Sequence, residues 1–252
     1  MKEKNNVFER FRNSFCRLNG HFHVLEQRIP IEVQIEYFKY SEQMRKNYAK
    51  MTEEEYYIYM HSLSNETLSS DHKKYILTSL AISSDVRAYR FLEDYAQHPE
   101  ADIAHWAYMA LMESRISLES ELLEEKQIYI STGLGGKGEK LRFYVLIIAL
   151  KEEPFQEYQR QTIESEFTYY LPSEDIEIER LTIYDSYVEL VLLIPVRKDI
   201  KTILDNIIAE CNQYGNFLSN IITVTNVKEL SADEVAEIIQ TRYADKNNKA
   251  GH

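Results

Sequence analysis

The sequence predicts an α+β chain of two domains, an all-helical N-terminal half followed by a half that mixes strands and helices. Three observations lead to this prediction. Apolar residues recur at helical spacing up to about residue 125, and β-rich apolar runs replace them beyond that point. At 252 residues with 44% hydrophobic residues, the chain is also long enough to bury more than one core. We expect a helical domain at 1–126, a mixed domain at 127–244 and a polar tail at 245–252.

The first segments of the helical half show amphipathic patterning. A basic segment at 7–18 carries four apolar residues on one face: Phe8, Phe11, Phe15 and Leu18. Pro30 allows a new helix to start, and three residues then continue the helical spacing: Ile31, Ile35 and Phe38. Thr52 and Glu55 form a capping-box pattern, which predicts the start of another helix.

An internal repeat follows in the helical half. Segments 71–80 and 102–111 share an acid, an aromatic residue, a small residue and a leucine at an offset of 31 positions. Another predicted helix, 86–96, lies between them. Repeated helix pairs are typical of α-solenoids, because one pair cannot bury its apolar face alone. Residues 65–125 therefore resemble short HEAT-like repeats, with Asp85-Val86-Arg87-Ala88 as a helix opening. A non-repetitive helical bundle is the alternative, and the resemblance implies no catalytic residues.

The C-terminal half alternates strands and helices. In chain order we expect a short strand at 127–131, a strand at 142–150 and a helix between Pro154 and Pro172. A hairpin of strands 176–184 and 187–196 follows, then a helix capped by Asp199 and a strand at 221–225. Ser231 and Glu234 open a last helix. From residue 142 the order β-α-β-β-α-β resembles the ferredoxin-like fold, which ACT-type regulatory modules, RNA-recognition modules and acylphosphatase-like enzymes share. Fold alone does not choose among these functions.

The helix-free face of such a sheet is unusually apolar in this sequence. In the expected fold both helices cover one face, so side chains on the other face should be polar if they meet water. We instead predict an apolar interface on that face, formed by Tyr144, Leu146, Ile148, Leu150, Tyr187, Val191 and Leu193. Leaving about six such side chains in water would cost on the order of 10 kcal/mol. The helical half, a second copy of the chain or a partner protein are the three candidates to cover it.

A glycine cluster precedes the strand at 142–150. It holds four of the seven glycines, and their backbone N–H groups are free to wrap an anion, with positive charge from neighbouring side chains. The candidate ligand-binding residues are Gly133, Gly135, Gly136, Lys137, Gly138 and Arg142. The pattern is not a P-loop, which needs GxxxxGK[ST] between a strand and a helix. A hairpin or an interdomain hinge accounts for the glycines equally well.

Tyrosine is frequent, and six of the 19 tyrosines lie between residues 37 and 59: Tyr37, Tyr40, Tyr48, Tyr56, Tyr57 and Tyr59. Tyrosine suits an interface because it combines an apolar ring with a polar tip. Packing between helices is the alternative explanation.

Composition excludes several classes of protein. A net charge of −12 and a pI near 5.2 disfavour nucleic acid and anionic membranes as partners. Two cysteines cannot make a disulfide framework, and no apolar stretch reaches the length of a membrane span. We find no spacing typical of a metal site and no nucleophile motif. We therefore predict a cytoplasmic protein with no cofactor, no metal and no catalytic residue.

Together these patterns predict a non-enzymatic protein-interaction adaptor or regulatory module. The expected partner is another protein or a second copy of the chain, with no nucleic acid and no membrane. A small-ligand sensor of the ACT-like kind, binding a small anion or metabolite, is the alternative, and an enzyme of unknown class is third.

Overall fold

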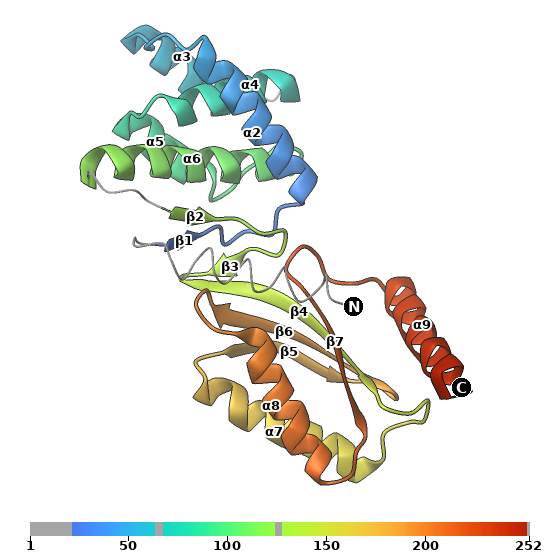
Figure 1. Cartoon of the computed structure of the whole chain (residues 1–252). Coiled ribbons are helices and arrows are strands. Elements are labelled where there is room, and N and C mark those ends of the chain that lie inside the picture. Colours follow the sequence, from blue (N-terminus) through green and yellow to red (C-terminus); the bar gives the residue numbers. More distant parts are fainter. Residues whose placement is uncertain (1–21, 64–67, 124–127, 251–252) are drawn as a thin grey trace. The chain divides into compact units, whose positions relative to one another are not determined.

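The computed structural model describes residues 22–63, 68–123 and 128–250 (Figure 1). Over these residues the chain is mixed α/β, with eight helices and an antiparallel sheet. It divides into two compact units between Ser131 and Thr132. We call the described residues up to 131 the helical unit and those from 132 the sheet unit. The predicted amphipathic helix at 7–18 lies outside the described residues.

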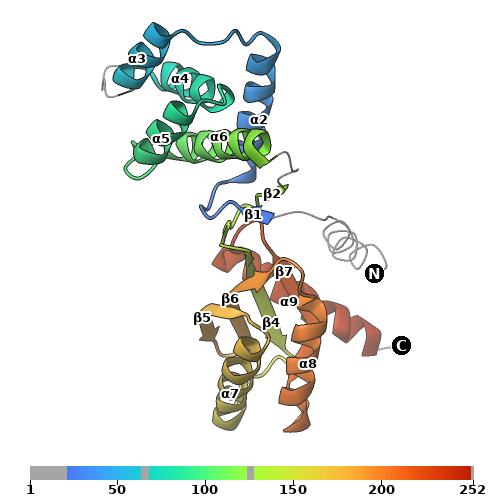
Figure 2. The same cartoon turned by 90° about the vertical axis from the view of Figure 1, so that its left-hand side faces the viewer.

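The helical unit consists of five helices and a small two-stranded sheet (Figures 1 and 2). Its helices are α2 (Ile31–Lys46), α3 (Glu53–Ser62), α4 (Ser70–Ile82), α5 (Val86–Tyr95) and α6 (Ala104–Leu123). Strands β1 (Phe22–Val24) and β2 (Ile128–Ile130) pair in parallel, and only the second of them was expected. The predicted capping box of Thr52 and Glu55 opens α3, and Asp85 caps α5. The HEAT-like arrangement stays a prediction.

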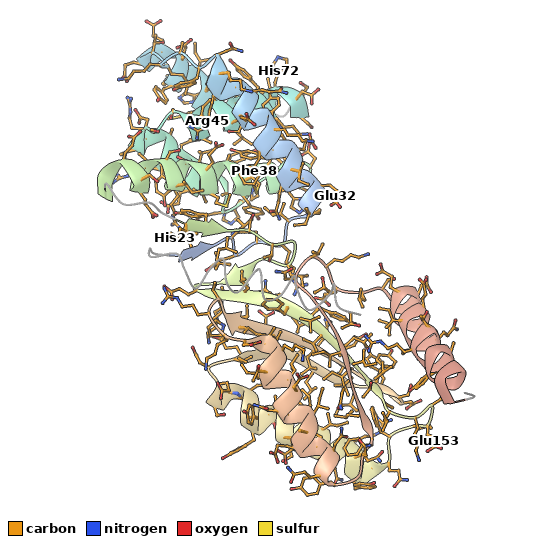
Figure 3. All side chains as sticks on the ribbon, in the orientation of Figure 1. His23, Glu32, Phe38, Arg45, His72 and Glu153 are labelled. Carbon is orange, nitrogen blue, oxygen red and sulfur yellow. The ribbon has the colours of Figure 1, made fainter. Side chains whose placement is uncertain are left out.

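Helix α2 buries a different face from the one that its apolar residues suggest. Ile35 and Phe38 are 50% and 44% exposed, whereas Tyr37 is fully buried and Ser41 is 2% exposed. Phe38 is labelled on α2 in Figure 3. The reason is a carboxylate on α6, Glu113, which accepts hydrogen bonds from both buried residues. A buried carboxylate needs such donors, so the face that supplies them turns inward.

The sheet unit follows the predicted order of strands and helices. Its elements are β3 (Gly136–Lys137), β4 (Lys140–Ala149), α7 (Glu157–Ser173), β5 (Glu177–Ile183), β6 (Tyr187–Pro195), α8 (Ile200–Gln213), β7 (Leu218–Thr225) and α9 (Ala232–Ala250). Two ends differ from the expectation. Helix α7 includes Pro172 in its last turn, and α9 continues through residues 245–250, where a polar tail was expected.

The central strands of the sheet are β4 and β6. β5 and β7 pair outside them, giving the strand order β5-β6-β4-β7, and β3 forms a hairpin with β4. All these pairings are antiparallel; Tyr144 lies opposite Val191, for example. Helices α7 and α8 lie on one side of the sheet and α9 on the other (Figures 1 and 2). Among the described residues, none of the helices is both long and apolar enough to cross a membrane.

Candidate functional site

The apolar face assigned to an interface is covered by the chain's own C-terminal helix. Tyr144, Leu146, Ile148 and Val191 are each at most 1% exposed and form one cluster with Val235 of α9. Leu230, Ile238 and Ile239, before and within α9, pack against this cluster, as does Tyr187. Of the other predicted residues, Leu193 is buried and Leu150 is half-buried. The cover is therefore α9, which was not among the three expected candidates, and the face belongs to the core of the sheet unit.

The glycine cluster makes a buried turn. A Cβ atom on Gly133 would lie 1.8 Å from the backbone oxygen of Val227, so only glycine fits this close approach. Gly135 and Gly138 have φ angles of 66° and 58°, in the region that favours glycine. Gly136 is buried within β3. Three of the four glycines, Gly133, Gly135 and Gly138, thus have structural reasons for their positions.

The two cations assigned to this cluster face carboxylates. Arg142 pairs with Glu179 at 2.5 Å and donates to the backbone oxygen of Leu134 at 2.7 Å. Lys137 pairs with Glu177 at 3.1 Å. The positive charges that were expected to attract an anion are balanced by the acidic residues of β5.

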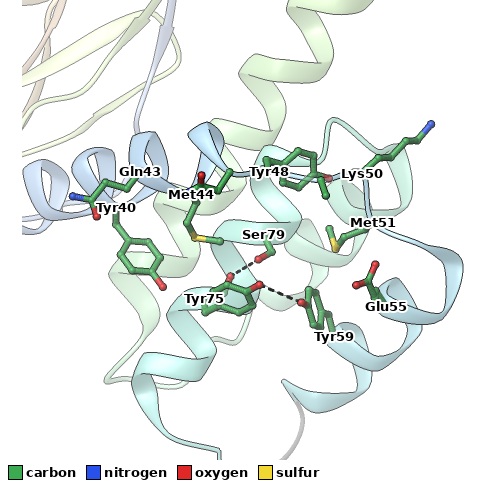
Figure 4. A pocket seen from close by; sticks show the side chains of 12 residues that line it. Tyr40, Gln43, Met44, Tyr48, Lys50, Met51, Glu55, Tyr59, Tyr75 and Ser79 are labelled. Atoms are coloured by element: carbon green, nitrogen blue, oxygen red, sulfur yellow. Dashed lines mark hydrogen bonds between the residues drawn. The ribbon is translucent and has the colours of Figure 1, made fainter.

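A cavity of about 480 Å³ in the helical unit is the candidate functional site (Figure 4). It lies between the C-terminal half of α2, the connection to α3, and helices α3 and α4. Its lining residues are Tyr40, Gln43, Met44, Asn47, Tyr48, Ala49, Lys50, Met51, Glu55, Tyr59, Tyr75 and Ser79. Since four of the twelve are tyrosines, we call it the tyrosine cavity.

Contacts with neighbouring side chains hold the tyrosine rings. The Tyr59 and Tyr75 hydroxyls are 3.5 Å apart, and their rings meet edge to face with centroids 6.1 Å apart (Figure 4). The Tyr40 ring packs edge to face on Trp106, with centroids 5.4 Å apart. Trp106 is 2% exposed and donates from Nε1 to the Thr78 hydroxyl at 2.9 Å. Rings held in this way offer apolar surfaces without losing much conformational freedom when a ligand binds.

The buried Glu113 network fixes α2 against α6. The Glu113 carboxylate accepts from the Tyr37 hydroxyl at 2.6 Å, the Ser41 hydroxyl at 2.5 Å and the Arg45 guanidinium at 2.8 Å. Burial, followed by the charge of Glu113, raises the pKa of Tyr37 well above its usual value. Because Tyr40 and Met44 lie on the same helix, this network also fixes their positions beside the cavity.

The side chains that line the cavity carry almost no net charge. Burial raises the pKa of Tyr59 to about 12 and also raises that of Tyr40, so both phenols are uncharged at neutral pH. The Glu55 carboxylate accepts from the Thr52 backbone N–H at 2.8 Å, within the capping box of α3. Lys50 extends outward at the edge of the site (Figure 4). Over residues 22–63, 68–123 and 128–250, no three His, Cys, Asp or Glu side chains group as a metal site requires. The cavity therefore suits an uncharged planar ligand.

The sequence analysis identified some of these tyrosines but did not predict that they line a cavity. Of the six tyrosines between residues 37 and 59, Tyr40, Tyr48 and Tyr59 line the cavity. Tyr37 and Tyr56 are buried, and Tyr57 is 67% exposed. The fourth ring of the cavity comes from Tyr75 on α4, outside the run, so tyrosine density was the only available signal.

The chain matches no protein-family model and no curated protein. It is similar to part of the solved structure of a REP-associated tyrosine transposase bound to a REP hairpin, with a TM-score of 0.32 and 8% identity. That similarity covers 35% of this chain and 57% of the transposase chain. A second similar structure is a putative transposase from Deinococcus radiodurans R1, with a TM-score of 0.35 and 15% identity. It covers 43% of this chain and 95% of that one.

These structures contradict three sequence-based predictions. Both are of transposases and one is bound to a REP hairpin, whereas we predicted an adaptor or regulatory module, an ACT-like sensor as the alternative, and no nucleic-acid partner. The argument from charge covers only one mode of nucleic-acid binding. A net charge of −12 disfavours binding dominated by phosphate contacts, but it leaves recognition through the bases open. At these TM-scores the likeness carries no argument about activity, so a function has to be argued from the chain's own residues.

Proposed function

We propose that the helical unit binds single-stranded nucleic acid and holds one unstacked base in the tyrosine cavity. The observation that carries this proposal is the lining of four tyrosines and two methionines around about 480 Å³. Pockets of roughly 300–1,000 Å³ commonly hold small ligands, so a base with its sugar fits this size. Single strands are the suitable form, because their bases are free to leave the stack and lie against aromatic side chains.

The charge of the unit decides how such a strand is held. Residues 20–131 contain 11 Lys/Arg and 19 Asp/Glu, a net charge of −8, which opposes extensive phosphate contact. Stacking on an aromatic ring contributes about 1–3 kcal/mol, so two rings that enclose one base would together contribute about 2–6 kcal/mol. The expected dissociation constant is therefore about 50 µM or weaker. Lys50 is the one basic residue of the lining and is placed to meet a single phosphate.

Fluorescence anisotropy with a labelled single-stranded 12-mer tests the proposal. One phosphate contact gives a slope of about −0.7 for log K against log salt, so raising the salt from 50 to 200 mM should weaken binding only about threefold. The matching duplex should bind more weakly than the single strand, because its bases are stacked. Equal binding of the duplex, or a salt effect of a hundredfold or more, would contradict base capture.

Two tyrosine substitutions separate the cavity from the rest of the surface. Tyr59→Ala should weaken binding of the single strand about tenfold, since it removes a stacking ring from the cavity. Tyr57→Ala is the matched control, because Tyr57 lies on the same helix, is 67% exposed and does not line the cavity. Equal effects of the two substitutions would contradict the assignment of this cavity as the site that binds the base. Circular dichroism of both variants checks that the helices are retained.

A further inference from the structure

We infer that helix α2 pairs in antiparallel orientation with α2 of a second copy of this chain. The surface that carries the inference is a stripe of three apolar residues along the outer side of the helix: Ile31, Ile35 and Phe38. We call it the outer stripe. Ile35 is 50% exposed and Phe38 is 44% exposed. Steps of four and three positions place the three side chains in one row on the helix surface.

Contacts within the helical unit leave the outer stripe on the surface. Glu113 of α6 accepts hydrogen bonds from Tyr37 and Ser41, and these bonds fix which side of α2 turns inward. Among the described residues, the side chains that form the core of this unit or pack against it include none of the outer stripe. The stripe does not line the tyrosine cavity either, so the inference is independent of the proposed function. Removing these side chains from water requires a partner from outside the unit.

Two charges beside the outer stripe favour another α2 as the partner. Glu32 and Lys39 are exposed on the same flank of the stripe, and within the described part of the chain neither has an ion-pair or hydrogen-bond partner. Glu36, by contrast, is paired with Lys74 at 2.8 Å. The flank therefore offers a negative charge near the start of α2 and a positive charge further along. A surface with this order of charges is complementary to itself when one copy is turned end to end.

The positions of these charges decide the orientation of the pair. With a twofold axis between residues 36 and 37, Ile35 of one copy lies opposite Phe38 of the second copy. Glu32 then lies opposite position 41, about 3 Å along the helix axis from Lys39 of the second copy, which is within reach of these long side chains. The symmetry makes this contact twice. In a parallel pair the flank that carries both charges faces the other flank of the second helix, so the two charges do not meet.

Sedimentation velocity of the full-length protein at a series of concentrations tests the inference. One helix from each copy makes a small contact, so the protein should be monomeric at about 1 µM and increasingly dimeric toward about 500 µM. Ile35→Ser combined with Phe38→Ser removes the apolar contact and should leave a monomer over the whole range. A protein that is monomeric at every concentration, its stripe left to the sheet unit or to another protein, would overturn the inference. A dimer that survives the double substitution would overturn it as well.

Exchange of the two charges separates antiparallel pairing from other dimers. Glu32→Lys and Lys39→Glu each replace two attractive contacts by two repulsive ones, so each should weaken dimerisation about tenfold. The two substitutions together restore opposite charges across the contact, and dimerisation should return to that of the unsubstituted protein. Glu54→Lys is the matched control and should have no effect, since Glu54 is exposed and lies on α3. If the double exchange dimerises as weakly as the single variants, the inference is wrong.

Discussion

Replacing Val235 by aspartate tests whether α9 is the cover of the helix-free face of the sheet. Val235 is 3% exposed and packs in one apolar cluster with Leu146, Ile148 and Val191. The same substitution at Val227, which precedes α9 and is 50% exposed, is the matched control. A carboxylate at position 227 stays in water, whereas one at position 235 must enter the cluster or displace the helix.

Two responses are open to Val235→Asp, and their costs differ. Release of α9 would expose four side chains that are now at most 1% exposed, at about 1.5–3 kcal/mol each and about 6–12 kcal/mol in total. Keeping α9 packed at pH 7 requires the introduced carboxyl to be protonated about 3 pH units above its ordinary pKa, which costs about 4 kcal/mol. The lost valine burial adds about 2 kcal/mol. The packed form is the cheaper one, so we expect the free energy of unfolding to fall by about 6 kcal/mol.

The pH dependence of this loss has a definite sign. The folded state raises the pKa of the introduced carboxyl, so the deficit is largest at neutral pH and shrinks as the pH falls toward about 4. At pH 5 it should be about 3 kcal/mol, since each pH unit changes it by about 1.4 kcal/mol. Urea denaturation followed by far-UV circular dichroism measures the deficit against the unsubstituted protein at both pH values. Equal midpoints for the substitutions at 235 and 227, or a deficit independent of pH, would refute the reasoning.

Three further predictions concern buried contacts and titration. Glu113→Ala leaves the buried hydroxyls of Tyr37 and Ser41, both residues at most 2% exposed, without their acceptor. It should lower the free energy of unfolding measured in urea by about 2–6 kcal/mol. A loss below about 1 kcal/mol would contradict the network. Gly133→Ala, whose Cβ would collide with the Val227 backbone oxygen, should cost more than about 3 kcal/mol, whereas Gly138→Ala, with open space but a φ of 58°, should cost about 1 kcal/mol in the same assay. The pKa of Tyr59 is raised to about 12 in the folded state, so the stability that this shift contributes is complete below a pH of about 10 and is lost as the pH rises toward 12. Between pH 9 and pH 11 the free energy of unfolding should therefore fall less in Tyr59→Phe than in the unsubstituted protein. An identical fall in the two proteins would contradict the assignment.

The helix starts could be read from the sequence because each is decided within a few neighbouring residues. Thr52 and Glu55 form their capping box, and Asp85 and Asp199 accept from the first backbone N–H groups of α5 and α8. The order of strands and helices in the sheet unit was also predicted correctly. It follows from the change of apolar spacing from that of helices to that of strands, which is likewise a local property.

Contacts between distant residues were the source of the wrong expectations. The buried face of α2 was misjudged because it is set by Glu113, about 70 positions further along the chain. The terminal helix was read as fraying into a polar tail, and its docking on β4 and β6 depends on residues 40 to 90 positions away. The prediction that excluded nucleic acid used the net charge, which is a sum over the whole chain and does not describe where the side chains lie in the fold.

Residue order alone established that the sheet carries apolar side chains on both faces, since strand alternation assigns each side chain to a face before any partner is known. It also established an excess of tyrosine near residues 37–59. Which segment covers the second face, and which tyrosines meet around a cavity, emerged only from the packed chain. Whether a side chain is buried depends on the residues that pack against it, and these come from other elements of the fold. In this protein α9 supplies them for the second face of the sheet, and α4 supplies the fourth tyrosine of the cavity.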